Sequence, residues 1–165
     1  MAETTANNVA YFIIRDCRDR GYYITNLKLQ KLLFYAQAWY LAIEGKPLFD
    51  EDFQAGVTGP IQREAYRRFE PYKWHPIKEY PDKVELPPQI EEILTDVINE
   101  YGMRLAYYLE RTIKSEDPWL NARGGIPENE DSMAIISKEE MQIYYRDFVR
   151  EVEVEEEEEA QVSYV

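Results

Sequence analysis

The sequence predicts a mainly α-helical protein, with one globular helical domain over residues 1–150, a central buried helix, and an acidic C-terminal tail over residues 151–165. Three observations predict this fold class. Apolar residues recur at helical spacing in several segments, glycine and proline residues separate those segments, and 45% of the 165 residues are apolar, which supplies enough material for a core.

The first helix is expected between Thr5, which is a suitable N-cap residue, and Gly21. One face of it carries the apolar residues Val9, Phe12, Ile13 and Cys17. We interpret Cys17, the one cysteine of the chain, as a buried core residue. A single cysteine excludes a disulfide within the chain and fits a reducing compartment. Because no segment resembles a signal peptide or a membrane span, the sequence predicts a cytoplasmic protein.

The second helix is expected from Thr25, another suitable N-cap, to Glu44, with Gly45 ending it. Its apolar residues lie on opposite sides, which is typical of a buried central helix. They are Leu29, Leu32, Leu33, Ala36, Tyr40 and Ile43 on the main face, and Leu27, Phe34, Ala38 and Leu41 on the other. Its polar residues fall in two narrow strips, one with Gln30 and Gln37, the other with Lys28 and Lys31 beside Tyr35 and Trp39.

The middle of the chain is expected to hold one short β element and one helix. Residues 53–57 form the candidate extended segment, and the third helix follows it with Pro60 at its first helical position, directly after Gly59. The free face of this helix carries the three arginines Arg63, Arg67 and Arg68. Residues 70–88 contain five prolines, so they are predicted to be a long loop, and loops of this length are often functional.

Four more helices are expected in the second half of the chain. Apolar spacing, glycine stops and a capping box predict helices over residues 90–101 and 103–114, a short helix that carries Trp119 after Pro118, and a last helix that starts at Ser137. The tail beyond Arg150 holds seven glutamates and no lysine or arginine, so we expect it to be mobile.

The sequence lacks the residue sets of the common catalytic and cofactor sites. One histidine, His75, and one cysteine are too few for a zinc site, and no Walker-type, G-x-G-x-x-G, G-x-S-x-G or H-E-x-x-H motif occurs. We therefore expect a protein that is not an enzyme and that needs no metal and no cofactor. The net charge of −13 repels phosphate backbones, so neither nucleic acid nor a membrane is an expected partner, whereas a basic protein is.

Several segments resemble the SocA-like antitoxin (Panacea) domain family. Residues 25–37 resemble its signature L-K-L-x-K-L-L-Y-Y-x-Q, residues 45–49 resemble G-x-P-L-F, and Ala55 with residues 59–61 resembles A-x-x-x-G-P-V. Looser matches are Tyr101-Gly102, Leu105, Leu109 and Pro118-Trp119. The resemblance covers roughly residues 8 to 150. The chain departs from the pattern at Phe34, where the family has tyrosine, and at Gly56, where an aromatic residue is expected.

The resemblance implies a bacterial or phage-associated antitoxin that binds and neutralises a small toxin encoded nearby. An alternative within the family is an adaptor that delivers the toxin to a Clp-type protease. A carboxylate-based hydrolase that uses the loop around His75 is the rival from another class. The candidate partner-binding residues are Lys28, Lys31, Tyr35, Gln37, Gly59, Pro60, Arg63, Arg67, Arg68 and Trp119. Each of them also has a structural explanation, as the edge of a buried helix, a helix start or a solvated face.

Overall fold

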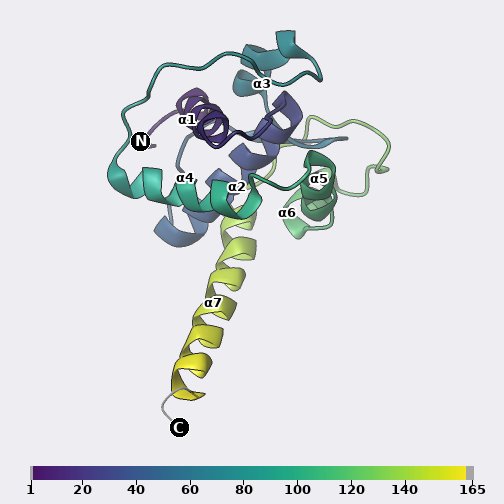
Figure 1. The fold of residues 1–165 in the computed structure, drawn as a ribbon. Helices are drawn as coiled ribbons and strands as arrows, with labels where there is room; N and C mark the ends of the chain where they lie inside the picture. The colour runs from purple at the N-terminus through teal and green to yellow at the C-terminus, as the bar shows by residue number, and fades with distance from the viewer. Residues whose placement is uncertain (1, 163–165) are drawn as a thin grey trace.

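The computed structural model describes residues 2–162 and is mainly α-helical, which confirms the predicted fold class (Figure 1). Its elements are α1 (Ala6–Asp19), α2 (Asn26–Glu44), β1 (Phe53–Gly56), β2 (Gly59–Gln62), α3 (Arg63–Phe69), the 3-10 turn η1 (Glu70–Tyr72), α4 (Pro88–Tyr101), α5 (Ala106–Lys114), α6 (Asp117–Arg123) and α7 (Lys138–Val162). None of the helices in this range is long and apolar enough to cross a membrane.

Helix α2 lies at the centre, as its apolar pattern predicts. The side chain of Thr25 accepts a hydrogen bond from the amide of Lys28, and Gly45 ends the helix in a left-handed conformation. Helices α1, α4, α5 and α7 and the β hairpin all pack against α2. Most of its residues are therefore buried, whichever side of the helix they occupy.

The β hairpin corrects one prediction. Gly59 and Pro60 do not open a helix but lie in β2, which pairs antiparallel with β1 so that Pro60 is opposite Ala55. Helix α3 begins at Arg63 instead, because the side chain of Gln62 caps it by accepting a hydrogen bond from the amide of Ala65. The backbone φ of Gly59 is +99°, a conformation that favours glycine in a tight turn.

Two further boundaries differ from the predictions. Helix α5 begins at Ala106 and not near residue 103, because the chain makes a turn after Tyr101, whose carbonyl accepts a hydrogen bond from the amide of Arg104. The predicted loop over residues 70–88 contains the turn η1 at its start, and Pro88 already belongs to α4. The rest of this loop runs past α1, where the guanidinium of Arg15 lies 4.4 Å from the centre of the Tyr80 ring.

Helix α7 packs on α2 at its start and then extends away from the domain (Figure 1). Tyr145 is buried in an aromatic cluster, with its ring 6.2 Å from Phe34 and 5.2 Å from Trp39. Beyond Arg150 the described side chains are exposed, and the backbone stays helical to Val162. The expected mobility of residues 151–165 stays a prediction, and residues 163–165 of that tail lie outside the described residues.

Removing residues 151–165 should leave the fold intact, because the described side chains of this segment are exposed and none belongs to the core. We expect the melting temperature of the shortened protein to stay within about 2 °C of the full chain. Thermal unfolding followed by circular dichroism measures this. Tyr145→Ala is the control that must lower the melting temperature, and a drop of several degrees on truncation would show that the segment stabilises the domain.

Candidate partner-binding site

The two glutamines of α2 point into the protein and hold the neighbouring chain segments in place. Gln37 donates to the carbonyl of Phe49 at 2.7 Å and accepts from the amide of Leu48 at 2.8 Å. Gln30 accepts a hydrogen bond from the amide of Gln62 at 2.8 Å, at the end of β2. Since all these groups are buried, the glutamines fix the hairpin and the segment before it against α2.

The two lysines of α2 are buried as well. The ammonium of Lys28 donates to the carbonyl of Gly102. The ammonium of Lys31 has no hydrogen-bond partner among the described residues, and a Cβ atom at Gly59 would lie only 3.2 Å from its Cε. Burial lowers the pKa of Lys31 to about 8, an effect that the attraction of Glu110 opposes. Lys31 therefore lies directly under the hairpin turn without reaching the surface.

Tyr35 and Trp119 also make internal contacts. The Tyr35 ring stacks on Tyr101 at a centroid distance of 3.8 Å, and burial raises the pKa of its hydroxyl. The indole of Trp119 donates to the carbonyl of Gly56 at 3.1 Å, and Arg123 donates to the carbonyl of Ala55 at 2.9 Å. Both side chains of α6 therefore bond to the backbone of β1.

A late segment of the chain completes the hairpin. The amide of Ala55 donates to the carbonyl of Ala134, and the amide of Ile136 donates to the carbonyl of Phe53. The carboxylate of Asp131 accepts a hydrogen bond from the amide of Val57 at 3.0 Å, and its two backbone hydrogen bonds lower its pKa. The shape of the hairpin turn thus depends on residues that are almost 80 positions away in the sequence.

The three arginines of α3 differ in their surroundings. Arg63 is half-buried and donates to the side chain of Gln54 at 2.7 Å. Arg68 forms two hydrogen bonds with the carboxylate of Glu79, at 2.9 and 2.7 Å, and this pairing raises its pKa. Arg67 is exposed, and its guanidinium has no hydrogen bond or ion pair within the described residues. Of the ten predicted residues, these three are the ones that the structure leaves at the surface.

A cleft of about 570 Å³ lies between the start of α2, the hairpin and α3. Its lining combines cationic, aromatic and apolar side chains with the two carboxylates of Glu70 and Asp131. The cationic, aromatic and apolar residues include Leu27, Val57, Ile61, Arg63, Tyr66, Lys73 and Trp74. Trp74 is 72% exposed. Arginine, tyrosine and tryptophan are the residues that most often dominate protein–protein interfaces, so this surface has the chemistry of a protein-binding site.

The sequence predicted only Arg63 among the residues that line this cleft. Tyr66 lies on the predicted third helix, and Trp74 lies in the predicted loop, whose length and prolines were a signal for function. Nothing in the sequence indicates that Leu27 and Asp131 line the same cleft, because these two residues are about 100 positions apart.

The titratable groups elsewhere in the described part of the chain were the other candidates for a site. Within residues 2–162 there is no group of three or more His, Cys, Asp or Glu side chains that could hold a metal ion. Cys17 is buried, and desolvation raises the pKa of its thiol to about 11. Burial also raises the pKa of Glu116 to about 7, against the effect of a hydrogen bond from the Tyr145 hydroxyl at 2.6 Å. His75 lies next to Trp74, at a ring distance of 5.0 Å, and both are exposed.

Comparison with known proteins identifies the class of this helical domain. The family described as "Antitoxin SocA-like, Panacea domain" matches residues 29–120, which is more than half of the chain, so the chain belongs to this family. This confirms the resemblance seen in the sequence. Membership of an antitoxin family supports an antitoxin role and implies, in general terms, a toxin as the partner.

The chain is similar to the curated Antitoxin SocA of Caulobacter vibrioides (strain NA1000 / CB15N), with 44% identity over 46 residues. The alignment covers 28% of this chain and 24% of that relative, so the matched segment spans about a quarter of the relative's length. No solved structure matches the chain.

Proposed function

We propose that this protein is a cytoplasmic antitoxin that binds a small toxin encoded nearby and neutralises it by direct contact, without altering it chemically. The observation that carries the proposal is the cleft beside the hairpin, where Arg63, Tyr66 and the exposed Trp74 converge. Residues of the family signature pack against the hairpin that forms one wall of this cleft. Gln30 of α2 accepts a hydrogen bond from the end of β2, and the side chain of Lys31 lies against Gly59.

A rigid scaffold with exposed aromatic and arginine side chains suits tight protein binding. The hairpin backbone is fixed by α2, α6 and the segment around residue 134, so it loses little conformational freedom when a partner binds. Arg67 lies one turn along α3 from Arg63, which lines the cleft, and its exposed guanidinium is available for a carboxylate of the partner. The buried signature residues then act by positioning this surface, not by touching the toxin.

Arg67→Glu should weaken rescue from the toxin while leaving the fold unchanged. Reversing the charge at an interface ion pair lowers affinity by about tenfold or more, whereas an exposed substitution changes stability by only about 0.5 kcal/mol. The measurement is growth after co-expression with the adjacent reading frame, together with a pull-down and a thermal scan. Arg111→Glu, at an exposed arginine of α5, is the matched control and should rescue like the wild type. Arg68→Glu is less suitable, because it would break the pair with Glu79.

A titration of purified antitoxin against a fixed amount of toxin tests the mechanism. An end point at a fixed stoichiometric ratio supports neutralisation by binding. Rescue at a small fraction of the toxin concentration that requires a Clp-type protease would indicate an adaptor instead. Rescue at such a fraction with no protease present would contradict the proposal and favour a catalytic activity, such as the carboxylate-based hydrolase.

A further inference from the structure

A second groove lies on the face from which α7 projects. It has a volume of about 460 Å³ and runs between α2, α4 and α7. Its apolar side chains are Trp39, Ile43, Ile93, Val97, Tyr101 and Phe148. Ile43 is 51% exposed and Phe148 is 38% exposed. Single exposed apolar residues are common on protein surfaces, whereas a group of them in one groove indicates a binding site for a partner.

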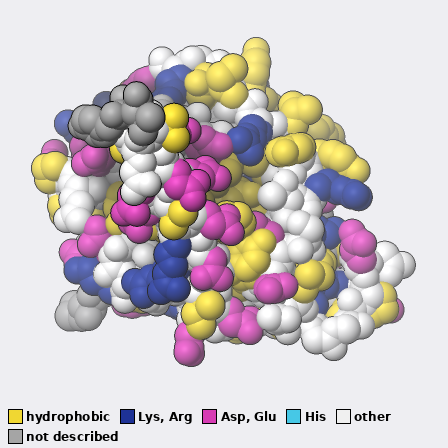
Figure 2. Space-filling view, turned by 90° about the horizontal axis from the view of Figure 1, so that it is seen from below, with side chains coloured by type: hydrophobic (Ala, Val, Ile, Leu, Met, Phe, Trp, Pro, Cys, Tyr) yellow, Lys and Arg dark blue, Asp and Glu magenta, His cyan; other side chains and the backbone are white. Residues whose placement is uncertain are grey.

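Two carboxylates lie along one side of this groove. Asp96 and Glu100 of α4 line its edge; Glu100 is paired with Arg104, whereas Asp96 has no ion pair within the described residues. Figure 2 looks at the face from which α7 projects and shows acidic side chains next to apolar ones, with some basic side chains among them. The groove is therefore apolar inside and negatively charged at its rim.

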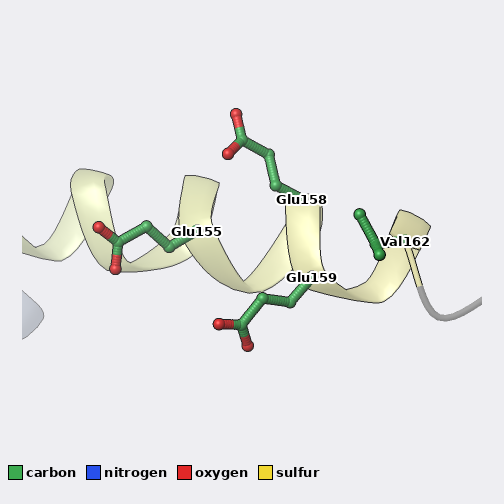
Figure 3. A pocket seen from close by; sticks show the side chains of 4 residues that line it. All are labelled: Glu155, Glu158, Glu159 and Val162. Atoms are coloured by element: carbon green, nitrogen blue, oxygen red, sulfur yellow. The ribbon is translucent and has the colours of Figure 1, made fainter.

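The face of α7 that contributes Phe148 continues outward as an acidic stripe. Glu151, Glu155 and Glu159 follow Phe148 at helical spacing, so they lie on the same side of the helix. Figure 3 shows Glu155, Glu158 and Glu159 along the projecting part of α7, where no other element packs against them. Arg146 and Arg150 are on the opposite side of α7 by the same spacing. We use the name acidic groove for the groove together with Glu151, Glu155 and Glu159.

We propose that the acidic groove binds a positively charged amphipathic helix of the partner protein, with its apolar side in the groove and its lysine or arginine residues along α7. This inference rests on the proposed function in taking the toxin as that partner. An amphipathic helix in an apolar groove is a common mode of recognition, and the charge of this groove selects a cationic helix. A second copy of the chain fits this surface less well, because it would bring another seven glutamates against it.

A synthetic helix tests the groove without the toxin. The probe is a fluorescent peptide of about 18 residues, built from leucine on one face and lysine on the other. Its affinity for the full-length protein is measured by fluorescence anisotropy at about 0.15 M salt. Ile43→Glu should weaken binding by about tenfold or more. The control Ile135→Glu changes an isoleucine that is also 51% exposed but lies outside the groove, and it should bind like the wild type.

The charge of the stripe is tested by two matched triple variants. Replacing Glu151, Glu155 and Glu159 by glutamine should weaken peptide binding by about fivefold or more. The same change at Glu153, Glu156 and Glu157 removes an equal charge from other faces of α7 and should have a much smaller effect. Equal losses in both triple variants, no effect of Ile43→Glu, or no binding by the wild type would overturn the proposal. Sedimentation that shows a dimer broken by Ile43→Glu would overturn it in favour of a second copy.

The same variants separate this inference from the proposed function. If the wild type rescues growth and Ile43→Glu does not, although it stays folded in a thermal scan, the acidic groove binds the toxin. If the wild type, Ile43→Glu and the first triple variant all rescue equally, the toxin does not use the groove and the inference fails, while the antitoxin function stands. If the wild type itself gives no rescue and no pull-down, the proposed function fails, and the peptide measurement alone decides whether the groove takes a cationic helix.

Discussion

Leu33→Ala should lower the free energy of unfolding by about 2–5 kcal/mol, the usual range for a large-to-small change in a closely packed core. The side chain of Leu33 is fully buried at the middle of α2. Because helices and the hairpin pack against α2 from several sides, the surroundings cannot collapse easily into the space that the substitution leaves. The loss should therefore include the cavity term as well as the lost transfer free energy.

Urea unfolding of the wild type and the variant measures this difference. The control is Leu120→Ala in α6, which makes the same chemical change in a helix at a leucine that is 45% exposed. We expect the control to change stability by less than about 1 kcal/mol. A loss below about 1 kcal/mol for Leu33→Ala would show that this residue is not in the core, and the central position of α2 would then be wrong.

Lys31→Met should make the folded protein more stable at neutral pH. The ammonium of Lys31 is buried and has no hydrogen-bond partner in residues 2–162, and its pKa is lowered from 10.5 to about 8 because burial disfavours the charged form. Below pH 8 both the folded and the unfolded chain carry the proton, so the folded state bears the full cost of burying the charge. A shift of this size corresponds to roughly 3 kcal/mol, and methionine fills a similar volume without any charge.

The pH dependence provides a second, independent readout. Between pH 8 and 10.5 the unfolded chain binds more protons at this lysine than the folded chain does, so its contribution to stability rises with pH across this window. In Lys31→Met that rise should be missing. Lys83→Met, at an exposed lysine, should keep the wild-type pH dependence. Equal stability of Lys31→Met and the wild type at pH 7 would show that a partner such as Glu110 fully compensates the buried charge.

The helices of this fold are predictable from the sequence because their signals are local. Thr5, Thr25 and Gly45 cap α1 and α2 as their residue types suggest, and the two-sided apolar pattern of α2 identifies the central helix. Gly59-Pro60 is different, because a turn before a helix and a turn within a hairpin use the same residues. The choice depends on Ala55 opposite Pro60, and this pairing follows from contacts across the fold.

The candidate site was less predictable than the fold. A polar residue on a mostly apolar helix is equally compatible with an edge at the surface and with an internal hydrogen bond. Lys28 and Gln37 are internal because backbone carbonyls, those of Gly102 and Phe49, lie within their reach. Every residue has a backbone carbonyl, so the sequence does not show which carbonyls will lie near a given side chain. The internal position of Lys28 and Gln37 could therefore not be predicted. Arg67 is where its helix face predicts, since the opposite face of α3 holds the buried Ala65 and Phe69.

The dependence of the hairpin on residues 131–136 sets an order of events during synthesis. A nascent chain that has just produced β1 and β2 has the strands but lacks Trp119, Arg123 and the segment that bonds to Ala55 and Phe53. The ribosome must add about 75 more residues before the cleft can take its final shape, which at about 5–20 residues per second requires several seconds. During that interval the surface beside the hairpin is unfinished, and it becomes able to recognise a partner only after residue 136 has left the ribosome.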